Sequence, residues 1–360
     1  MKKKTAFLLA AAMVLSLTLF AYAAGGDASD PLVSLSYLTG IFTRKVDAQV
    51  DEKLDASDAA LLESSGQTAF TSSTWAEQRL KEGDILIAPT GTSVLLLAGR
   101  AQVSFSAGAV IDVTTGTAVS SGTDLAVNHR YMAAEDTSAL FTITSKTAVM
   151  DYQGSCSFSE SDATDYNAMA AALKTLHLFK GSFTGYGEGF DLEAAPTRLQ
   201  ALIMFIRVLG EEEEALSWSG TAPFTDIAPG TQAAQYVGYA YSKGYTNGYT
   251  ATTFKPAGAV NAWQYTEFIL RAMGYSSAAN TNLTDTFLRA QDAGILTVGE
   301  SEMLQHDPFL RAELVYISYY ALDAEMTDSG RTLSDELERK GVFTAAERSQ
   351  ALRMVSSERK

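Results

Sequence analysis

Residues 181–210 read GSFTGYGEGFDLEAAPTRLQALIMFIRVLG, and this stretch decides the fold because diverged copies of it return later in the chain. A shift of 113 residues carries three of its positions onto identical ones: Gly181 onto Gly294, Arg198 onto Arg311 and Leu209 onto Leu322. A shift of 64 does the same for four: Phe190 onto Phe254, Gln200 onto Gln264, Arg207 onto Arg271 and Gly210 onto Gly274. Long internal periods are typical of stacked units that bury their apolar faces on one another. We therefore predict three helical repeats, at residues 163–217, 224–275 and 283–322.

The first copy combines a glycine-rich turn with an amphipathic helix. Pro196 stands near the helix start, Gly210 follows its end, and the apolar stripe comprises Leu199, Leu202, Ile203, Ile206 and Leu209. Glycine loops that bind phosphate open directly onto a helix, whereas residues 190–195 intervene here. We predict a structural turn with Phe190 as an apolar plug. The acidic run Glu211–Glu214 is interpreted as a solvated face.

The N-terminus has the pattern of a secretory signal peptide. Three lysines precede an apolar run over residues 6–20, and Ala21-Tyr22-Ala23 supplies small residues at the positions a signal peptidase reads. We predict removal of residues 1–23, which takes the formal net charge from -15 to -18. Nucleic acid is an improbable partner for so acidic a chain, because lysine and arginine dominate binding to phosphate. The single cysteine, Cys156, excludes an intramolecular disulfide.

The spacing of apolar residues over 30–62 predicts a long amphipathic helix. Asp30-Pro31 is typical of a helix start, and apolar residues then recur at steps of three and four as far as Leu54. Such a helix packs on its own protein or pairs with another chain, and the sequence leaves both open.

The residue pattern over 67–158 predicts an all-β domain. Short β-branched runs alternate there with glycines, with strand candidates at 85–88, 94–97, 102–105, 110–113, 118–120, 125–127, 140–144 and 148–152. This rhythm is typical of a sandwich, a jelly roll or a small barrel. Asn128-His129-Arg130-Tyr131 is the one cluster in this domain with chemical potential, and we interpret it as a polar strand end. The overall prediction is a multidomain α+β protein.

No signature of catalysis or of metal binding accompanies these domains. His129, His177 and His306 do not form a His-Glu-x-x-His motif, and no Gly-x-Ser-x-Gly elbow occurs. We expect no enzyme activity, no cofactor and no metal. Residues 325–360 form a charged helical tail, in which Thr344 and Glu347 match a capping box.

The second copy resembles an S-layer homology repeat. The resemblance rests on Phe224-Thr225-Asp226, on the run Ala240-Tyr241-Ser242-Lys243-Gly244-Tyr245-Thr246-Asn247-Gly248, on Phe254-x-Pro256, and on a helix that ends Leu270-Arg271-Ala272-Met273-Gly274. The starts of the other long helices, Thr197-Arg198-Leu199-Gln200 and Leu310-Arg311-Ala312-Glu313, resemble that family's Thr-Arg-Ala-Glu signature. The layout is similar to that of secreted surface proteins of Gram-positive bacteria.

The resemblance implies a fold and a ligand. It implies three repeats around a pseudo-threefold axis and non-covalent anchoring to secondary cell-wall polysaccharide that carries pyruvate ketals. In that family the signature arginine meets the ketal carboxylate, and a guanidinium suits this task because its planar fork can bond both oxygens. It therefore implies Arg198 and Arg311 as ligand contacts, beside Thr197, Glu313 and Trp263. An ion pair with Glu193 or Glu313 is the alternative role for either arginine.

Departures from the family pattern leave three functions open. Ala262 stands where the second copy would have its arginine, and Gln200 replaces the glutamate of the first. Trp263 could stack on a sugar or belong to the core. The leading hypothesis is a wall-anchored surface protein that displays the β domain. The alternatives are a degenerate repeat module that binds other surface proteins or itself, and an enzyme with its site in the β domain.

Overall fold

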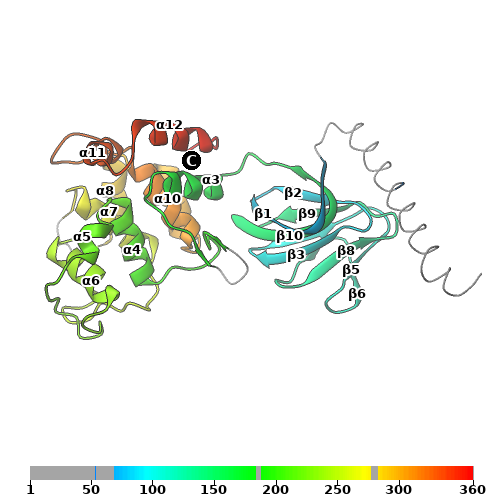
Figure 1. The fold of residues 1–360 in the computed structure, drawn as a ribbon, viewed down its shortest axis with the longest axis horizontal. Coiled ribbons are helices and arrows are strands. Elements are labelled where there is room, and N and C mark those ends of the chain that lie inside the picture. The colour runs from blue at the N-terminus through cyan, green and yellow to red at the C-terminus, as the bar shows by residue number, and fades with distance from the viewer. Residues whose placement is uncertain (1–52, 54–68, 184–187, 277–282, 360) are drawn as a thin grey trace, which may run out of the picture. The chain divides into compact units, whose positions relative to one another are not determined.

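The computed structural model describes residues 69–183, 188–276 and 283–359, together with Lys53. The predicted signal peptide at 1–23 and the predicted helix at 30–62, Lys53 aside, lie outside the described residues. Within the described part of the chain, no helix combines the length and the apolar character that a membrane span requires. The predicted α+β class is confirmed, since a large antiparallel sheet precedes a set of helices (Figure 1).

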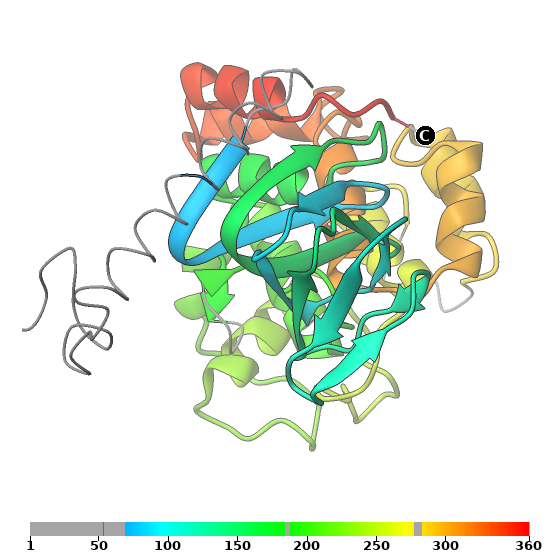
Figure 2. The same ribbon diagram turned by 90° about the vertical axis from the view of Figure 1, so that its right-hand side faces the viewer.

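The described residues before Glu160 form one ten-stranded antiparallel sheet that curls around an apolar interior (Figure 2). Its strands are β1 (Ala69–Lys81), β2 (Ile85–Ala88), β3 (Ser93–Ala98), β4 (Ala101–Ser104), β5 (Ala109–Asp112), β6 (Thr117–Val119), β7 (Thr123–Asp124), β8 (Arg130–Ala134), β9 (Ala139–Ile143) and β10 (Thr147–Ser159). The strand order is β6-β5-β8-β3-β10-β2-β9-β4-β7, and β1 pairs with β10. Alternating residues such as Leu86, Val94, Phe141 and Met150 fill the interior.

One strand prediction in this domain is wrong, and two strands were not predicted. Residues 125–127 are not a strand, and pairing stops instead at Asp124 in β7. The long strand β1 was not predicted, because polar residues and a register shift between Ser72 and Ala76 concealed it. Nor was β8, which begins within the polar strand end predicted at 128–131 and is paired on both sides by β3 and β5.

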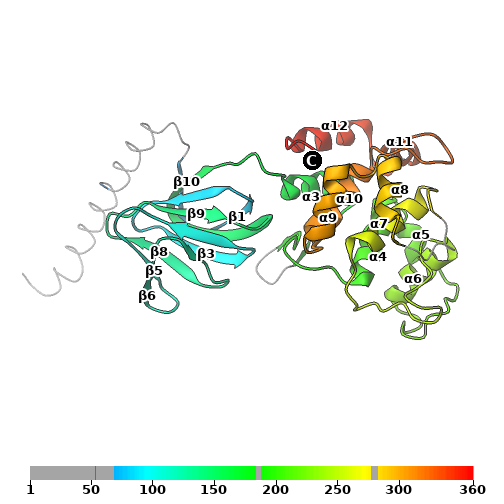
Figure 3. The same cartoon turned by 180° about the vertical axis from the view of Figure 1, so that it is seen from behind.

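Ten helices follow Asp165 in the described part of the chain (Figure 3). They are α3 (Tyr166–Thr175), α4 (Arg198–Val208), α5 (Glu212–Leu216), α6 (Gln232–Ser242), α7 (Ala262–Ala272), α8 (Thr286–Asp292), α9 (Val298–His306), α10 (Arg311–Ala321), α11 (Leu333–Lys340) and α12 (Ala345–Met354). A two-stranded hairpin of β11 (Ser182–Phe183) and β12 (Glu188–Gly189) occupies the glycine-rich turn before α4. The helices share one apolar core, to which α4, α7 and α10 each contribute a face.

Backbone hydrogen bonds between the repeats follow both sequence offsets. The amides of Arg198 and Leu199 donate to the carbonyls of Gly258 and Pro256, at 2.8 and 3.0 Å. The amides of Arg311 and Ala312, each 113 residues later, donate to Ala194 and Leu192 at 2.9 and 3.1 Å. Those two acceptors lie 64 residues before Gly258 and Pro256. At these two helix starts, the loop before one long helix therefore supports the start of another.

The cap of α3 is Asp165, whose Oδ1 accepts from the amide of Ala168 at 2.8 Å. The interpretation of the acidic run 211–214 as a solvated face is wrong for its first two residues. Glu211 accepts from the hydroxyls of Tyr239 and Tyr245 at 3.0 Å each, and Glu212 accepts from Arg207, Lys180 and Tyr236. Only the two glutamates that follow them are exposed, because the loop after α4 turns the first two back onto the core.

Candidate functional site

Arg198 is the first residue of α4, and the cap before it fixes where the side chain leaves the helix. Thr197 Oγ1 accepts from the amide of Gln200 at 3.2 Å, and Gln200 Oε1 accepts from the amide of Thr197 at 2.9 Å. Glutamine thus completes the capping box that the family signature assigns to glutamate. Thr197 serves the helix start, and Arg198 is directed toward the second repeat.

The Arg198 side chain is buried, with 5% of its surface exposed. Its Nη2 donates to the carbonyl of Gly248 at 3.2 Å, and its guanidinium carbon lies 5.0 Å and 5.4 Å from the ring centroids of Phe254 and Phe268. Its Nε is buried without a hydrogen-bond partner, and no described carboxylate forms an ion pair with it. Among the described residues, this cation is therefore held by a carbonyl and two rings rather than by a counterion.

Burial and a neighbouring cation both act against this charge. Burial, and to a smaller extent the nearby Arg271, lower the pKa of the Arg198 guanidinium to about 10, against an opposite effect of Tyr249. The group still carries its proton at neutral pH. A buried, uncompensated positive charge attracts an anion strongly because little water screens the interaction.

A cavity of about 180 Å³ lies beside Arg198. It is lined by Arg198, Asn247, Gly248, Tyr249, Gln264, Glu267, Phe268, Arg271 and Leu283. Gln264 Oε1 is a buried acceptor without a hydrogen-bond partner, and the ring of Tyr249 is 54% exposed. The cavity is thus bordered by a cation and an aromatic face, and the residues Arg198 and Gln264 of its lining each hold a buried polar atom without a hydrogen-bond partner.

The other charges at this cavity compensate one another. Glu267, 2% exposed, accepts from Arg271 Nε at 3.2 Å and from Arg289 Nη2 at 2.8 Å. Ser276 and Thr286 also donate to this carboxylate, at 2.5 and 3.3 Å. The network joins Glu267 and Arg271 of the cavity lining to each other, so that Arg198 is the lining cation without a described carboxylate partner.

Arg311, the counterpart of Arg198 in the third copy, has a carboxylate partner. Its Nη1 lies 3.3 Å from Asp191 Oδ2. Burial lowers the pKa of Arg311, and Asp191 acts in the opposite direction. The alternative foreseen for the signature arginines, an ion pair, is thus present at Arg311, although the partner is neither Glu193 nor Glu313.

Glu313 and Trp263 are engaged within the protein. One oxygen of Glu313 accepts from the amide of Leu310 at 2.7 Å and the other from Lys146 Nζ, and the residue is 1% exposed. Trp263 is partly buried and stacks on Phe287, with 5.2 Å between ring centroids and 18° between planes. Neither lines the cavity beside Arg198.

Sequence reasoning missed Gln264, Tyr249 and Gly248 as parts of the site. The latter two belong to the turn Tyr245-Thr246-Asn247-Gly248-Tyr249, which the sequence marked as a structural feature. Gly248 has a φ of +84°, and an added Cβ would lie 2.6 Å from the carbonyl oxygen of Thr250. Only glycine therefore holds the carbonyl that faces Arg198 without strain. Gln264 lies 64 residues after Gln200, so alignment of the repeats with one another could have placed Gln264 at the start of the second long helix and so near the site.

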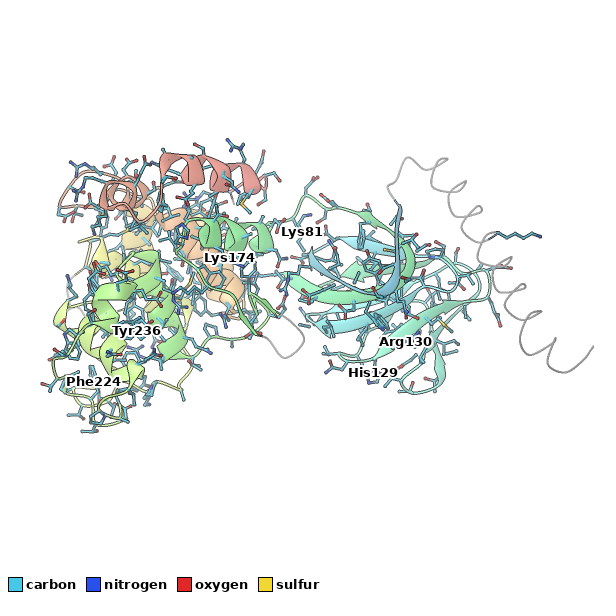
Figure 4. The ribbon with its side chains drawn as sticks, in the orientation of Figure 1. Lys81, His129, Arg130, Lys174, Phe224 and Tyr236 are labelled. Carbon is cyan, nitrogen blue, oxygen red and sulfur yellow. The ribbon has the colours of Figure 1, made fainter. Side chains whose placement is uncertain are left out.

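The polar cluster of the β domain lies at the start of β8, and Figure 4 labels two of its members, His129 and Arg130. His129 Nδ1 lies 2.8 Å from Asp112 Oδ2, a carboxylate that also accepts from the amides of Thr114 and Thr115 in the turn after β5. Arg130 donates to Ser93 Oγ at 2.8 Å and lies 5.3 Å from the Trp75 ring centroid. The described residues contain no group of three or more potential metal ligands.

Comparison with known protein families identifies one stretch among the helices. The family profile of the S-layer homology domain matches residues 223–261, a stretch that includes Gly248 and Tyr249 of the cavity. Curated proteins give no match.

Two sugar epimerases appear among the similar solved structures. One is dTDP-6-deoxy-D-glucose-3,5-epimerase from Legionella pneumophila Philadelphia 1 in complex with dTDP-4-keto-L-rhamnose, at 20% identity over 29% of this chain, with a TM-score of 0.17. The other is a 4-keto-6-deoxy sugar epimerase from the novobiocin biosynthetic gene cluster of Streptomyces spheroides, at 16% identity over 26% of this chain, with a TM-score of 0.12. The matches span 56% and 44% of those chains. At these TM-scores the likeness carries no argument.

Proposed function

Because this protein contains an S-layer homology domain at residues 223–261, which points to anchoring at the cell surface through a cell-wall polymer, we propose that it binds an acidic wall polysaccharide beside Arg198. In this proposal the chain is secreted, the helical repeats hold it to the wall, and the β domain is displayed. The domain points to a non-enzymatic, anchoring role.

One observation carries the proposal: Arg198 is a buried cation with a free N–H and no described counterion, at the edge of a cavity. A ligand carboxylate would remove the cost of that uncompensated charge. A hydrogen bond to a charged group contributes about 1.5–3 kcal/mol to binding, and it contributes more where the charged group would otherwise be buried without a partner. Secondary wall polysaccharide with pyruvate ketals provides such a carboxylate on a sugar.

The remainder of the cavity suits a sugar. Gln264 Oε1 is an acceptor for a hydroxyl or an acetamido N–H, and the exposed ring of Tyr249 can pack on a sugar face. Lys255 Nζ lies 3.6 Å from the Tyr249 centroid and adds positive charge at the rim. This local charge opposes the repulsion that an acidic protein exerts on an anionic polymer.

Retention on purified wall sacculi tests the proposal. We expect Arg198→Met to weaken retention by about 10- to 100-fold, the equivalent of one charge-assisted contact, while the matched control Arg311→Met stays close to wild type. Sacculi stripped of their polysaccharide should retain none of the three proteins.

Two results would contradict the proposal. Undiminished retention of Arg198→Met on intact sacculi would exclude the proposed contact. Equal retention on stripped sacculi would favour the alternative, in which the repeats bind protein rather than polymer.

A further inference from the structure

Two junctions between repeats share their backbone hydrogen bonds and loop conformation but differ in the charges of their side chains. We call Arg198 with the loop 254–258 the Arg198 junction, and Arg311 with the loop 190–194 the Arg311 junction. In both, the amide of the arginine donates to the fifth residue of the loop, Gly258 or Ala194, at 2.8 and 2.9 Å. Both loops begin with a phenylalanine, and in both the second residue has a positive φ, 58° at Lys255 and 54° at Asp191. The side chains at corresponding loop positions can therefore be compared directly.

The second and fourth loop positions reverse the charge. The Arg198 junction has Lys255 and Ala257 there, whereas the Arg311 junction has Asp191 and Glu193. Asp191 forms the ion pair with Arg311 at 3.3 Å, and Glu193 contributes a buried Oε2 without a hydrogen-bond partner. The Arg311 junction thus already holds one carboxylate on its cation and a second beside it.

This difference in loop charge determines whether binding of a ligand carboxylate at a junction is favourable. At the Arg198 junction it meets a cation without a described counterion, and at the Arg311 junction it would have to displace Asp191 and would face repulsion from Glu193. The third helix start contributes no cation, because Ala262 occupies the corresponding position.

We propose that Asp191 and Glu193 close the Arg311 junction to acidic ligands, so that this chain holds its wall polymer through the Arg198 junction alone. The loops before α4 and α7 then determine which junction accepts an acidic ligand. This inference rests on the proposed function and adds that only one of the two arginine junctions binds the polymer.

Exchange of the loop residues tests it. The double variant Asp191→Lys/Glu193→Ala gives the Arg311 junction the residues of the open one, and Lys is tolerated at a positive φ because Lys255 already adopts it. The reciprocal variant, Lys255→Asp/Ala257→Glu, should close the Arg198 junction. The probe is a methyl glycoside that carries a pyruvate ketal, titrated calorimetrically into the full chain.

We expect wild type to bind one equivalent, and Arg198→Met to bind none. The exchange placed in the Arg198→Met background should restore one equivalent, and addition of Arg311→Met should abolish it again. The milder pair Asp191→Asn/Glu193→Gln, which removes charge at nearly constant size, should restore the same site if the lysine variant fails to fold. Circular dichroism verifies folding of each variant.

The outcomes separate the two proposals. If wild type binds through Arg198 and neither exchange opens a second site, the inference about Asp191 and Glu193 is wrong and the proposed function stands. If wild type binds two equivalents, the Arg311 junction is already open, and the inference is equally wrong. If wild type binds no probe and is not retained on sacculi, the proposed function fails and this inference fails with it.

Discussion

Replacement of Arg198 by methionine should make the protein more stable while it weakens ligand binding by about 10- to 100-fold. The reason is the burial of an uncompensated charge. A cation whose pKa is lower in the folded state than in the unfolded state costs stability at every pH below the folded pKa. That cost disappears only as the pH rises through the folded value toward the unfolded one. At neutral pH the whole cost is present.

The magnitude follows from the local environment. The pKa of Arg198 falls from 12.5 to about 10, mainly through burial, and at about 1.36 kcal/mol for each pKa unit this corresponds to about 3 kcal/mol. Against it stand the hydrogen bond to Gly248, about 1 kcal/mol, and the contacts with the Phe254 and Phe268 rings, about 0.5–1 kcal/mol each. Methionine keeps apolar contact with both rings. We expect a net gain of about 1 kcal/mol.

Thermal and urea unfolding followed by circular dichroism measures this change. A gain of about 1 kcal/mol corresponds to about 2–4 °C in the midpoint of a domain of this size. The matched control Arg311→Met should change in the opposite direction by about 0–1 kcal/mol, because it removes the ion pair with the partly exposed Asp191. If Arg198→Met lowers the free energy of unfolding by more than about 1 kcal/mol, the guanidinium supports the fold and the argument from its uncompensated charge is wrong.

Three further predictions concern the surroundings of the site and the core. Gly248→Ala should lower the free energy of unfolding by about 1–3 kcal/mol, since its Cβ would lie 2.6 Å from a carbonyl oxygen at a φ of +84°, and unchanged urea unfolding would contradict this. Glu212→Gln should make the protein less sensitive to acid: burial raises the pKa of this carboxyl, but bonds from Lys180, Tyr236 and Arg207 outweigh it and hold the pKa at about 2. The stability that Glu212 provides is therefore lost as the pH falls from about 4.5 to about 2, a loss that unfolding at stepped pH would show for wild type and not for the variant. Arg359→Ala should cost about 2–4 kcal/mol in chemical denaturation, because it leaves the fully buried carboxylate of Glu300 without the guanidinium that lies 2.8 Å away; a loss below about 1 kcal/mol would show that other donors suffice.

Much of the helical architecture was predictable because its signals are local. Caps such as Thr197 and Thr344 and the apolar stripe of α4 depend on residues within a few positions of one another. The strands were harder to predict. β1 and β8 carry polar residues, and their pairing with distant segments overrides their weak local preference.

The sequence by itself determined that a unit recurs at offsets of 64 and 113 residues, which arginines begin the long helices, and that one copy lacks its arginine. Only the tertiary structure decided the state of each arginine. Arg311 is joined to Asp191, 120 residues away in the chain, whereas Arg198 meets a carbonyl, two rings and a cavity. The physical reason is that packing of one repeat on another sets the distance between charges far apart in sequence, and that distance determines whether a buried cation is compensated from within or remains available to a ligand.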